Sequence, residues 1–401
     1  MLGLSKVFGK SVVAGVDIGS RQIKLVQAEA IENDRWRINH VAVCPTPLEA
    51  VRDGVIVEVD TVGAAIKALI NSSGMDATAA VAAISGSSVI VRHVKLPRMT
   101  EAILRRSIRY EAARYISSSL DDSLVEFEIT GPVPNEDDKM AVMLVAAPND
   151  MIQTRVNAIL AAGLEPMSID IEAFAMQRCL IDINPDVTVA GETVALLNIG
   201  AATTDVNIVA NGSFALTRNI AIAGDNFTQA LRAVSRTQDW DEIEHIKHQV
   251  DMSALLQSGY ASDAMALAQA VQPAMDELLR EVRRSMNYYQ SQLADPSNSN
   301  LPCGVNQQNS GASVSRILVT GGSSKMMGIE QYMSARLGVP IAICDHYNNP
   351  NIEVGPQAQN AEHADHPCLS LCIGLAIKDS VSKQSQLRQI AKSNNIQSKV
   401  A

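Results

Sequence analysis

Aromatic side chains, basic clusters and long apolar runs are all scarce in this sequence of 401 residues. Phe, Trp and Tyr together make up 3% of the chain, so the core has to be built from aliphatic side chains and from 15 Met. The net charge is −10 without any basic block, which argues against nucleic-acid binding because that surface needs clustered Lys and Arg. Apolar runs such as 140–148 are too short to cross a bilayer. We therefore expect a soluble protein that reaches a membrane only through a partner or a surface helix.

Other signatures are missing as well. The six cysteines are scattered along the chain, which favours reduced, buried thiols over a disulfide framework and is typical of a cytoplasmic protein. The first ten residues hold no long apolar segment, so they do not predict a secretory signal. The sequence G-x₄-G-K-[ST] does not occur, which excludes a P-loop fold as far as a sequence can.

Two distant stretches each predict three strands joined by tight turns. The first covers 12–43 and the second 194–221, where Asn211-Gly212 is a strong hairpin signal. Their topology is therefore duplicated, although their sequences are not similar.

The first motif with chemical potential is Asp17-Ile18-Gly19-Ser20, which ends one predicted strand and opens a hairpin. Gly19 lets the backbone turn tightly enough for amides to face an anion, and Ser20 adds a hydroxyl donor. Asp17 could hold Mg²⁺ through water, since this ion gives up its water shell reluctantly. Viewed alone, such a segment is more often only a hairpin.

A second motif repeats these features in the other meander. It runs from Asn198 to Asp205 and contains Gly200, the small residue Ala201, and the hydroxyls of Thr203 and Thr204. Two such hairpins that face each other would clamp phosphates from both sides, so the pair is more specific than either half.

Three further features fit the same cleft. Gly321, Gly322 and Ser323 follow a predicted strand and could let an adenine lie against the backbone, although a plain strand-to-helix turn is equally compatible. Gly224-Asp225 opens a helix where the carboxylate could meet ribose hydroxyls. Glu172 also begins a helix and could orient an attacking water, or could simply complement the positive helix N-terminus.

In this order, the motifs resemble the nucleotide-binding elements of the actin-like ATPases. Longer stretches are similar to the PilM family of type IV pilus assembly, and FtsA of cell division looks like a more distant relative. The similar stretches are 15–28 (GVDIGSRQIKLVQA), 111–127 (EAARYISSSLDDSLVEF), 169–178 (IDIEAFAMQR), 197–205 and 318–340.

The resemblance implies an α/β fold of the actin-like, two-lobed type, with duplicated ribonuclease-H-like cores and an inserted small α/β subdomain. The implied division of the chain is a first core at 1–85 completed by 164–193, an insert at 86–163, a second core at 194–225 completed by 314–378, a helical subdomain at 226–294, a flexible loop at 295–313 and a disordered tail at 379–401.

The resemblance also implies a site for ATP and Mg²⁺, with Asp17 on the metal and Glu172 in the catalytic position. The implied nucleotide-binding residues are Asp17, Gly19, Ser20, Gln22, Lys24, Asn198, Gly200, Ala201, Thr203, Thr204, Gly224, Asp225, Gly321, Gly322 and Ser323. Related ATPases usually carry Asp where this chain has Asn198, and Asn cannot supply the charge. We therefore expect nucleotide binding with slow or negligible turnover.

By the same resemblance, the insert at 86–163 helps to form a groove for the cytoplasmic N-terminal peptide of PilN, an inner-membrane partner. This would place the protein at the cytoplasmic face of the inner membrane, where it could meet other pilus assembly proteins or copies of itself. Two alternatives stay open, namely a phosphotransferase or kinase on the same fold and a filament-forming, FtsA-like cytoskeletal protein.

Overall fold

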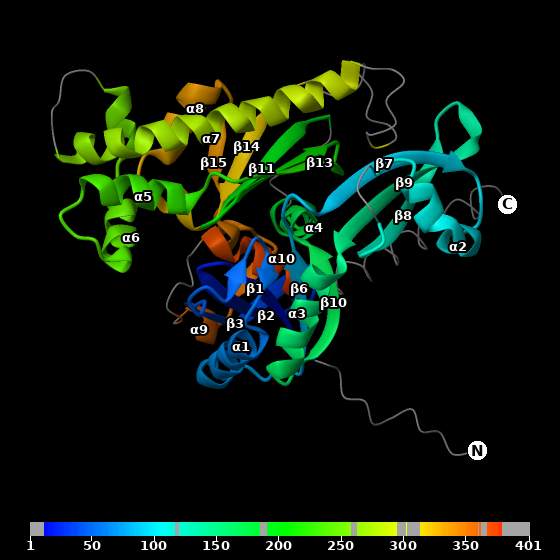
Figure 1. Ribbon diagram of the computed structural model, residues 1–401, viewed down its shortest axis with the longest axis horizontal. Coiled ribbons are helices and arrows are strands. Elements are labelled where there is room, and N and C mark those ends of the chain that lie inside the picture. Colours follow the sequence, from blue (N-terminus) through cyan, green and yellow to red (C-terminus); the bar gives the residue numbers. More distant parts are fainter. Residues whose placement is uncertain are drawn as a thin grey trace.

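Two sheets that share the same order over five strands organise the structure (Figure 1). The computed structural model describes residues 12–116, 120–184, 191–257, 263–294, 302, 313–359, 361 and 367–378. The tail predicted at 379–401 lies outside the described residues, as does the loop predicted at 295–313 except for residues 302 and 313.

The first sheet has the order β10-β6-β1-β2-β3-β16. Neighbours are antiparallel from β1 to β3, whereas β6, β10 and β16 join in parallel. Its strands are β1 (Val13–Ile18), β2 (Gln22–Ile31), β3 (Arg35–Pro45), β6 (Ala79–Ile84), β10 (Glu165–Ile171) and β16 (Ile352–Val354).

The second sheet has the order β13-β12-β11-β14-β15, again with an antiparallel meander followed by two parallel strands. This order matches β3-β2-β1-β6-β10 strand for strand, which confirms the predicted duplication. Its strands are β11 (Thr193–Ile199), β12 (Thr204–Ala210), β13 (Ser213–Ile220), β14 (Arg316–Thr320) and β15 (Ile341–Ile343).

The outer turns of the two meanders have the same local cause. Asn211 and Gly212 join β12 to β13 with φ angles of 51° and 75°, as a two-residue turn with positive φ at both positions requires. Asn33 and Asp34 adopt φ angles of 62° and 56° between β2 and β3. Asn and Asp tolerate this left-handed region better than other residues with a side chain, so both hairpins close where the sequence predicts.

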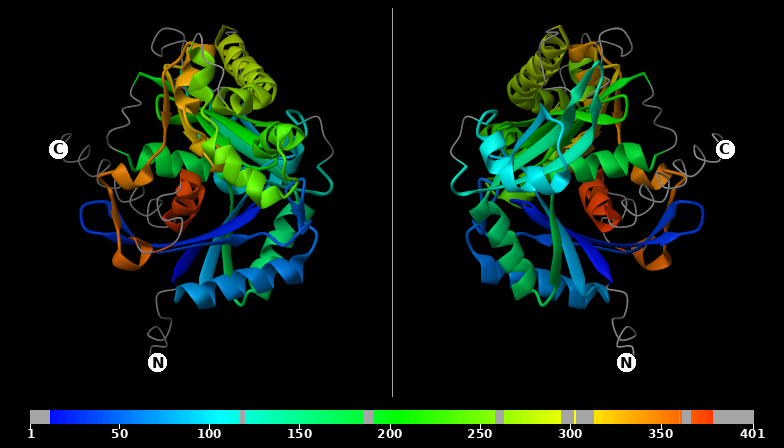
Figure 2. Two further views of the ribbon diagram at one scale, coloured as in Figure 1. Left: turned by 90° about the vertical axis from the view of Figure 1, so that its left-hand side faces the viewer. Right: turned by 90° about the vertical axis from the view of Figure 1, so that its right-hand side faces the viewer.

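Two short helices lie between the sheets, as the side views in Figure 2 show for the red helix α10. They are α4 (Glu172–Gln177), which continues as one π-helical turn over Arg178–Asp182, and α10 (Ser370–Ala376). One buried cluster joins them to both sheets through side chains such as Val26, Val81, Leu196 and Leu318. This shared core holds the lobes together.

Other helices cover the outer faces. In the first lobe, α1 (Val59–Ser73) packs with α3 (Asn149–Ala161) around Ile66 and Ile159. In the second lobe, α5 (Gly224–Val234), α6 (Trp240–Gln249), α7 (Asp263–Ala294) and α8 (Ile329–Leu337) enclose a core that includes Phe227 and Tyr289. Within the described part of the chain, no helix has the length and apolar character needed to cross a membrane.

The insert contains a three-stranded antiparallel sheet, ordered β7-β9-β8, which is covered by α2. Figure 1 shows this unit on the opposite side of the molecule from α5 and α6. Leu104 and Ile108 of α2 pack against Leu96 and Leu144 of the sheet. The bounds are β7 (Ile90–Pro97), α2 (Glu101–Ala112), β8 (Ser123–Val133) and β9 (Glu136–Pro148).

Several short strands and helices could not be predicted from the sequence patterns. β15 and β16 have three residues each, too few for an alternating pattern to show. β16 lies within 314–378 yet pairs with β3 of the first sheet, and α10 packs on β1 and β2. α3 lies within 86–163 but packs mainly on α1 and β10. The remaining short elements are β4 (Val51–Arg52), β5 (Val55–Ile56) and α9 (Pro356–Gln359).

The glycine in α10 provides a stability test. A Cβ at Gly374 would lie 1.9 Å from the carbonyl oxygen of Ala175 in α4. Helix propensity alone would favour Ala over Gly by about 1 kcal/mol, but overpacking of this kind costs about 1–3 kcal/mol or more. We expect Gly374→Ala to lower the free energy of unfolding in urea.

The matched control is Gly322→Ala, where an added methyl group meets no atom of the described part of the chain within 4 Å. Its unfolding free energy should stay close to that of the wild type. An unchanged or increased stability of Gly374→Ala would show that the two helices do not need this close approach.

Candidate functional site

The two predicted phosphate hairpins have the same local geometry, one in each lobe. Between β1 and β2, the amide of Gly19 donates to the Gln22 carbonyl oxygen at 3.0 Å. Between β11 and β12, the amide of Gly200 donates to the Thr203 carbonyl oxygen at 3.0 Å. A Cβ at either glycine would come within about 3.0 Å of that acceptor, so both turns need glycine.

Three predicted loops of the second lobe converge on Gly224. Its amide donates to the Gly200 carbonyl oxygen at 3.0 Å, and the next amide, of Asp225, donates to Ala201 at 2.8 Å. A Cβ at Gly224 would lie 2.5 Å from the Ser323 hydroxyl oxygen. The second phosphate hairpin, the Gly-Asp turn and the Gly321 loop therefore form one continuous surface.

The Gly321 loop approaches β11 closely as well. Gly321 has a φ of 94°, and a Cβ there would lie 2.4 Å from the Ile199 carbonyl oxygen and 2.8 Å from Oδ1 of Asn198. By contrast, a Cβ added at Gly322 meets no atom of the described residues within 4 Å.

Thr204 differs from the other predicted binding residues. Its side chain is fully buried, and its hydroxyl donates to the Ile222 carbonyl oxygen at 2.7 Å. Thr203 keeps part of its surface exposed at the hairpin tip. Of the two hydroxyls, the one on Thr203 is therefore the one available to a ligand.

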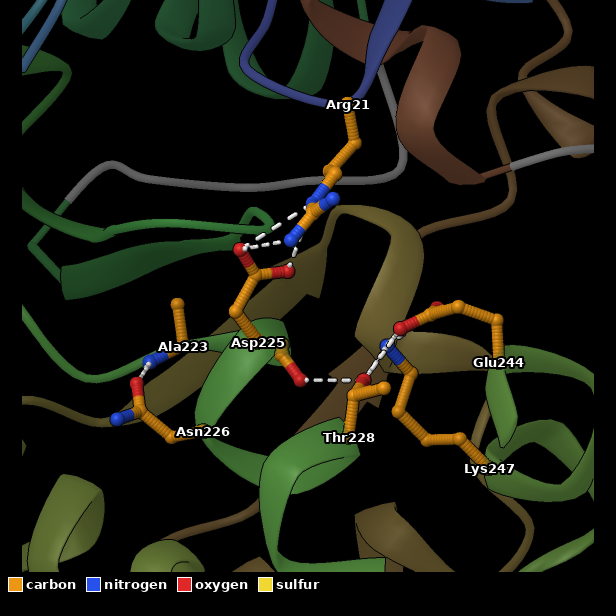
Figure 3. Close-up of polar contacts among 8 residues, drawn as sticks. Arg21, Ala223, Asp225, Asn226, Thr228, Glu244 and Lys247 are labelled. Atoms are coloured by element: carbon orange, nitrogen blue, oxygen red, sulfur yellow. Dashed lines mark hydrogen bonds and ion pairs between the residues drawn. The ribbon is translucent and has the colours of Figure 1, made fainter. Parts of the chain in front are cut away.

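A polar network lies beneath the Gly-Asp turn (Figure 3). Lys247 of α6 is only 4% exposed, and its ammonium group donates to Oε1 of Glu244 at 2.8 Å and to the Thr228 hydroxyl at 3.1 Å. Thr228 also hydrogen-bonds to Glu244 and to the Gly224 carbonyl oxygen. This network links α5 to α6 at the position where the turn begins.

In the first lobe, Asp17 forms an ion pair with Lys24, with 2.8 Å between Oδ2 and Nζ. Both side chains are largely buried. Burial opposes the charge on Lys24, but the adjacent Asp17 carboxylate outweighs it and raises the pKa of Lys24. Lys24 therefore keeps its charge, and its ammonium group lies directly against the Asp17 side chain.

Glu172 and Asp205 form a second electrostatic centre, and both hydrogen-bond to the Ser85 side chain. Burial, followed by the nearby charges of Asp205 and Asp17, raises the pKa of Glu172 to about 8, although Arg155 opposes this. Burial raises the pKa of Asp205 to about 6, against hydrogen bonds from Asn219 and Ser85. Both buried carboxyls therefore hold a proton to a higher pH than exposed carboxyls do.

The sequence motif includes Asp205 but does not indicate a role for it. Ser85 and Asn219 lie outside the predicted motifs. A pocket of about 240 Å³ lies beside them, lined by all three and by the arginines Arg92 and Arg218. Ser85 directly follows β6, which neighbours β1, so its position at a strand end was the signal that could have found it.

Asp17 is the main candidate ligand for a divalent cation near the two hairpins. Among the residues that the structure describes, no group of three or more His, Cys, Asp and Glu side chains could hold a metal ion. Mg²⁺ commonly keeps several waters and takes one or two carboxylates together with substrate phosphates. The residues present fit that mode of binding, but not a site made by the protein alone.

The raised pKa of Glu172 predicts how stability depends on pH. The unfolded chain releases this proton near pH 4.5, whereas the folded protein holds it until about pH 8. The folded state binds more protons in this window, so stability falls as the pH rises from about 5 to 8. We expect Glu172→Gln to flatten this slope when unfolding is measured in urea at several pH values.

Glu128→Gln, at an exposed position of β8, is the control and should keep the wild-type slope. A residual slope between about pH 4 and 6 would come from Asp205. If Glu172→Gln has the same slope as the wild type, the carboxyl is not protonated in the folded protein.

With this geometry described, known proteins provide a comparison. The family model described as "Type IV pilus assembly protein PilM" matches residues 15–380. FtsA of Pseudomonas aeruginosa is 23% identical over 399 residues, covering 88% of this chain and 89% of that protein. The match to FtsA of Bacillus subtilis is 22% identical and spans 57% of that protein.

Two solved structures have the same fold. One is described as the "PilM-PilN type IV pilus biogenesis complex", with a TM-score of 0.74, 22% identity and coverage of 92% of this chain and 99% of the other. The second is MreB5 of Spiroplasma citri bound to AMPPNP, with a TM-score of 0.51, 13% identity and coverage of 95% and 100%. These likenesses establish an actin-like fold.

Proposed function

The chain belongs to the PilM family of type IV pilus assembly proteins, and from this premise we propose that it is an ATP-binding scaffold of the inner-membrane assembly complex. It would work on the cytoplasmic face of that membrane and bind the cytoplasmic N-terminal peptide of PilN. One observation carries the proposal: the glycine hairpin of the first lobe meets the Gly200, Gly224 and Gly321 loops of the second lobe, where Arg21 contacts Asp225.

The chemistry of the cleft suits a nucleotide. Ser20 and Lys24 offer donors to phosphates from the first lobe and Thr203 offers one from the second, while Gly19 and Gly200, whose amides close their own turns, let a ligand approach the backbone. Asp225 lies where ribose hydroxyls would need an acceptor, and the space at Gly322 could admit a base. Asp17 would hold Mg²⁺ together with water and phosphate oxygens. The MreB5 structure with AMPPNP supports this use of the fold.

Slow turnover follows from the charges in the cleft. Asn198 brings no charge at the position where related ATPases usually have Asp. Burial and nearby carboxylates raise the pKa of Glu172, so part of this group is in the acid form at neutral pH and only the rest can act as a general base. Asp205 is the other carboxyl that could act as a base, but Asn219 already donates to its Oδ1 at 2.9 Å. The site is better suited to holding a nucleotide than to hydrolysing it rapidly.

The insert is the proposed seat of the PilN peptide. β8 is an edge strand of its three-stranded sheet, and Leu124 and Ile129 on this strand are 46% and 37% exposed. Unpaired backbone groups beside exposed apolar side chains suit an extended peptide. The PilM-PilN complex, which covers 92% of this chain, supports such a partner.

Nucleotide binding can be tested at Asp17. We expect ATP with Mg²⁺ to bind the wild type by calorimetry, and Asp17→Asn to weaken this binding at least tenfold because it removes the carboxylate that pairs with Lys24 and faces the metal. Steady-state phosphate release should stay close to background. Glu32→Gln, at the far turn of the same meander, should bind like the wild type.

Equal ATP affinity of Asp17→Asn and the wild type would contradict the proposed site. Phosphate release well above background that Glu172→Ala abolishes would instead show an active ATPase. Activity on a small metabolite would favour the phosphotransferase alternative.

Partner binding can be tested on β8. We expect Ile129→Asp to weaken the affinity for a PilN N-terminal peptide at least tenfold, measured by fluorescence anisotropy, because a charge replaces an exposed apolar contact. Leu48→Asp is the control, since Leu48 is 87% exposed but lies outside the insert. Equal loss in both variants, or loss in neither, would place the peptide elsewhere.

A further inference from the structure

Arg21 of the first lobe contacts the second lobe directly. It stands at the tip of the β1–β2 hairpin, directly after Ser20, and reaches Asp225 at the start of α5 (Figure 3). Its Nε lies 3.3 Å from both carboxylate oxygens of Asp225, and one terminal nitrogen lies 3.1 Å from Oδ2. The two residues are 204 positions apart in the chain.

A second contact holds the same guanidinium group. Its central carbon lies 4.2 Å from the ring centroid of Trp240, the first residue of α6. A cation at this distance is attracted to the face of the indole. Arg21 therefore joins the first lobe to two helices of the second lobe at once.

This contact uses the atoms that a nucleotide would need. Asp225 is the predicted partner of the ribose hydroxyls, and its backbone amide is fixed to Ala201 at 2.8 Å, so the carboxylate stays at the edge of the cleft. Arg21 lies within 3.3 Å of both carboxylate oxygens. A ribose that donates to them competes with the guanidinium group for the same two oxygens.

We propose that Arg21 is a latch, in which it competes with the ribose for Asp225 and so controls entry of the nucleotide. This inference rests on the proposed nucleotide site. Without ligand, Arg21 joins the lobes through Asp225 and Trp240. Binding of a nucleoside with free ribose hydroxyls releases Arg21 from Asp225 and changes the surroundings of Trp240.

The strength of the latch is moderate. The Arg21 and Asp225 side chains are 41% and 31% exposed, and exposed ion pairs are weak because water screens them. The indole contact adds a similar amount. Together they should lower the apparent affinity for a nucleoside on the order of tenfold, since only the open fraction of the protein can bind.

Trp240 provides a direct signal. The chain has two tryptophans, and the other, Trp36, is 3% exposed in the first lobe, where its indole nitrogen has no hydrogen-bond partner among the described residues. Trp36→Phe should therefore be tolerated and leaves Trp240 as the sole indole. Its emission then reports on the latch alone.

The experiment titrates adenosine and Mg-ATP into the Trp36→Phe protein, alone and combined with Arg21→Ala, Arg21→Lys or Arg236→Ala. Calorimetry measures the affinity for each ligand, and Trp240 emission reports the release of Arg21 from Asp225. Adenosine is neutral, so it isolates the ribose from the phosphates. Arg236 is an exposed arginine four residues before Trp240, and its removal is the matched loss of charge.

We expect Arg21→Ala to bind adenosine on the order of tenfold more tightly than its parent. The affinity of Arg21→Lys should lie in between, since Lys keeps the positive charge but loses the planar guanidinium group that can contact both carboxylate oxygens. Arg236→Ala should bind like the parent. Ligand should change Trp240 emission in the parent but much less in Arg21→Ala. Added salt should strengthen adenosine binding to the parent only, because salt weakens the ion pair.

Each remaining result overturns the latch. Equal adenosine affinity with and without Arg21 would contradict the latch but would leave the proposed nucleotide site standing. Weaker adenosine binding in Arg21→Ala would make Arg21 a ligand of the nucleoside rather than its competitor. If neither adenosine nor Mg-ATP binds any variant, the proposed function fails together with the latch.

Discussion

The close approach of α4 and α10 between the two sheets is the constraint on which the cleft depends. Gly374 lets α10 touch the backbone of α4, and Gly15 lets it touch β1, where a Cβ would lie 2.2 Å from the Cys372 carbonyl oxygen. Arg178 adds a polar tie, since it donates to the Gly374 carbonyl oxygen at 2.6 Å and to Asp170 at 3.0 Å. Glu172 begins α4 and Asp17 lies near the end of β1, so this packing sets the spacing of the acidic groups in the cleft.

That spacing has an electrostatic consequence. Asp17, Glu172 and Asp205 are close enough to influence one another, and burial adds to their repulsion. Two features reduce this repulsion. Asp17 pairs with Lys24, and the raised pKa of Glu172 favours its protonated, neutral form. A ligand that brings positive charge changes this balance, because like charges that share a buried site are held apart mainly by protons or cations. Proton binding and ligand binding in the cleft are therefore linked.

The sequence predicted the parts of this site that are local. Tight turns need glycine or asparagine at defined positions, so both meanders and the loops at Gly200, Gly224 and Gly321 could be located from residue types. Contacts between distant segments could not. Nothing near Arg21 in the chain indicates Asp225 or Trp240, and the strands β15 and β16 are recognised only by the partners they join. Asp205 was visible in its motif, but its role depends on Ser85, 120 positions earlier, and on a burial that no single segment reveals.

The second lobe also contacts the insert directly. These contacts determine whether a rotation of the second lobe would move the insert. His93 of β7 is buried, and its Nε2 lies 2.8 Å from the carbonyl oxygen of Phe214 in β13. Burial lowers the pKa of His93, so the neutral ring can donate its one proton there. The Phe214 ring meets Phe174 of α4 edge-on at 5.0 Å between centroids. A rotation of the second lobe has to break these contacts or carry β7 with it, because packed side chains adopt discrete arrangements rather than stretching. A ligand that changes the lobe angle can therefore alter partner affinity only if the two arrangements of β7 bind the partner differently.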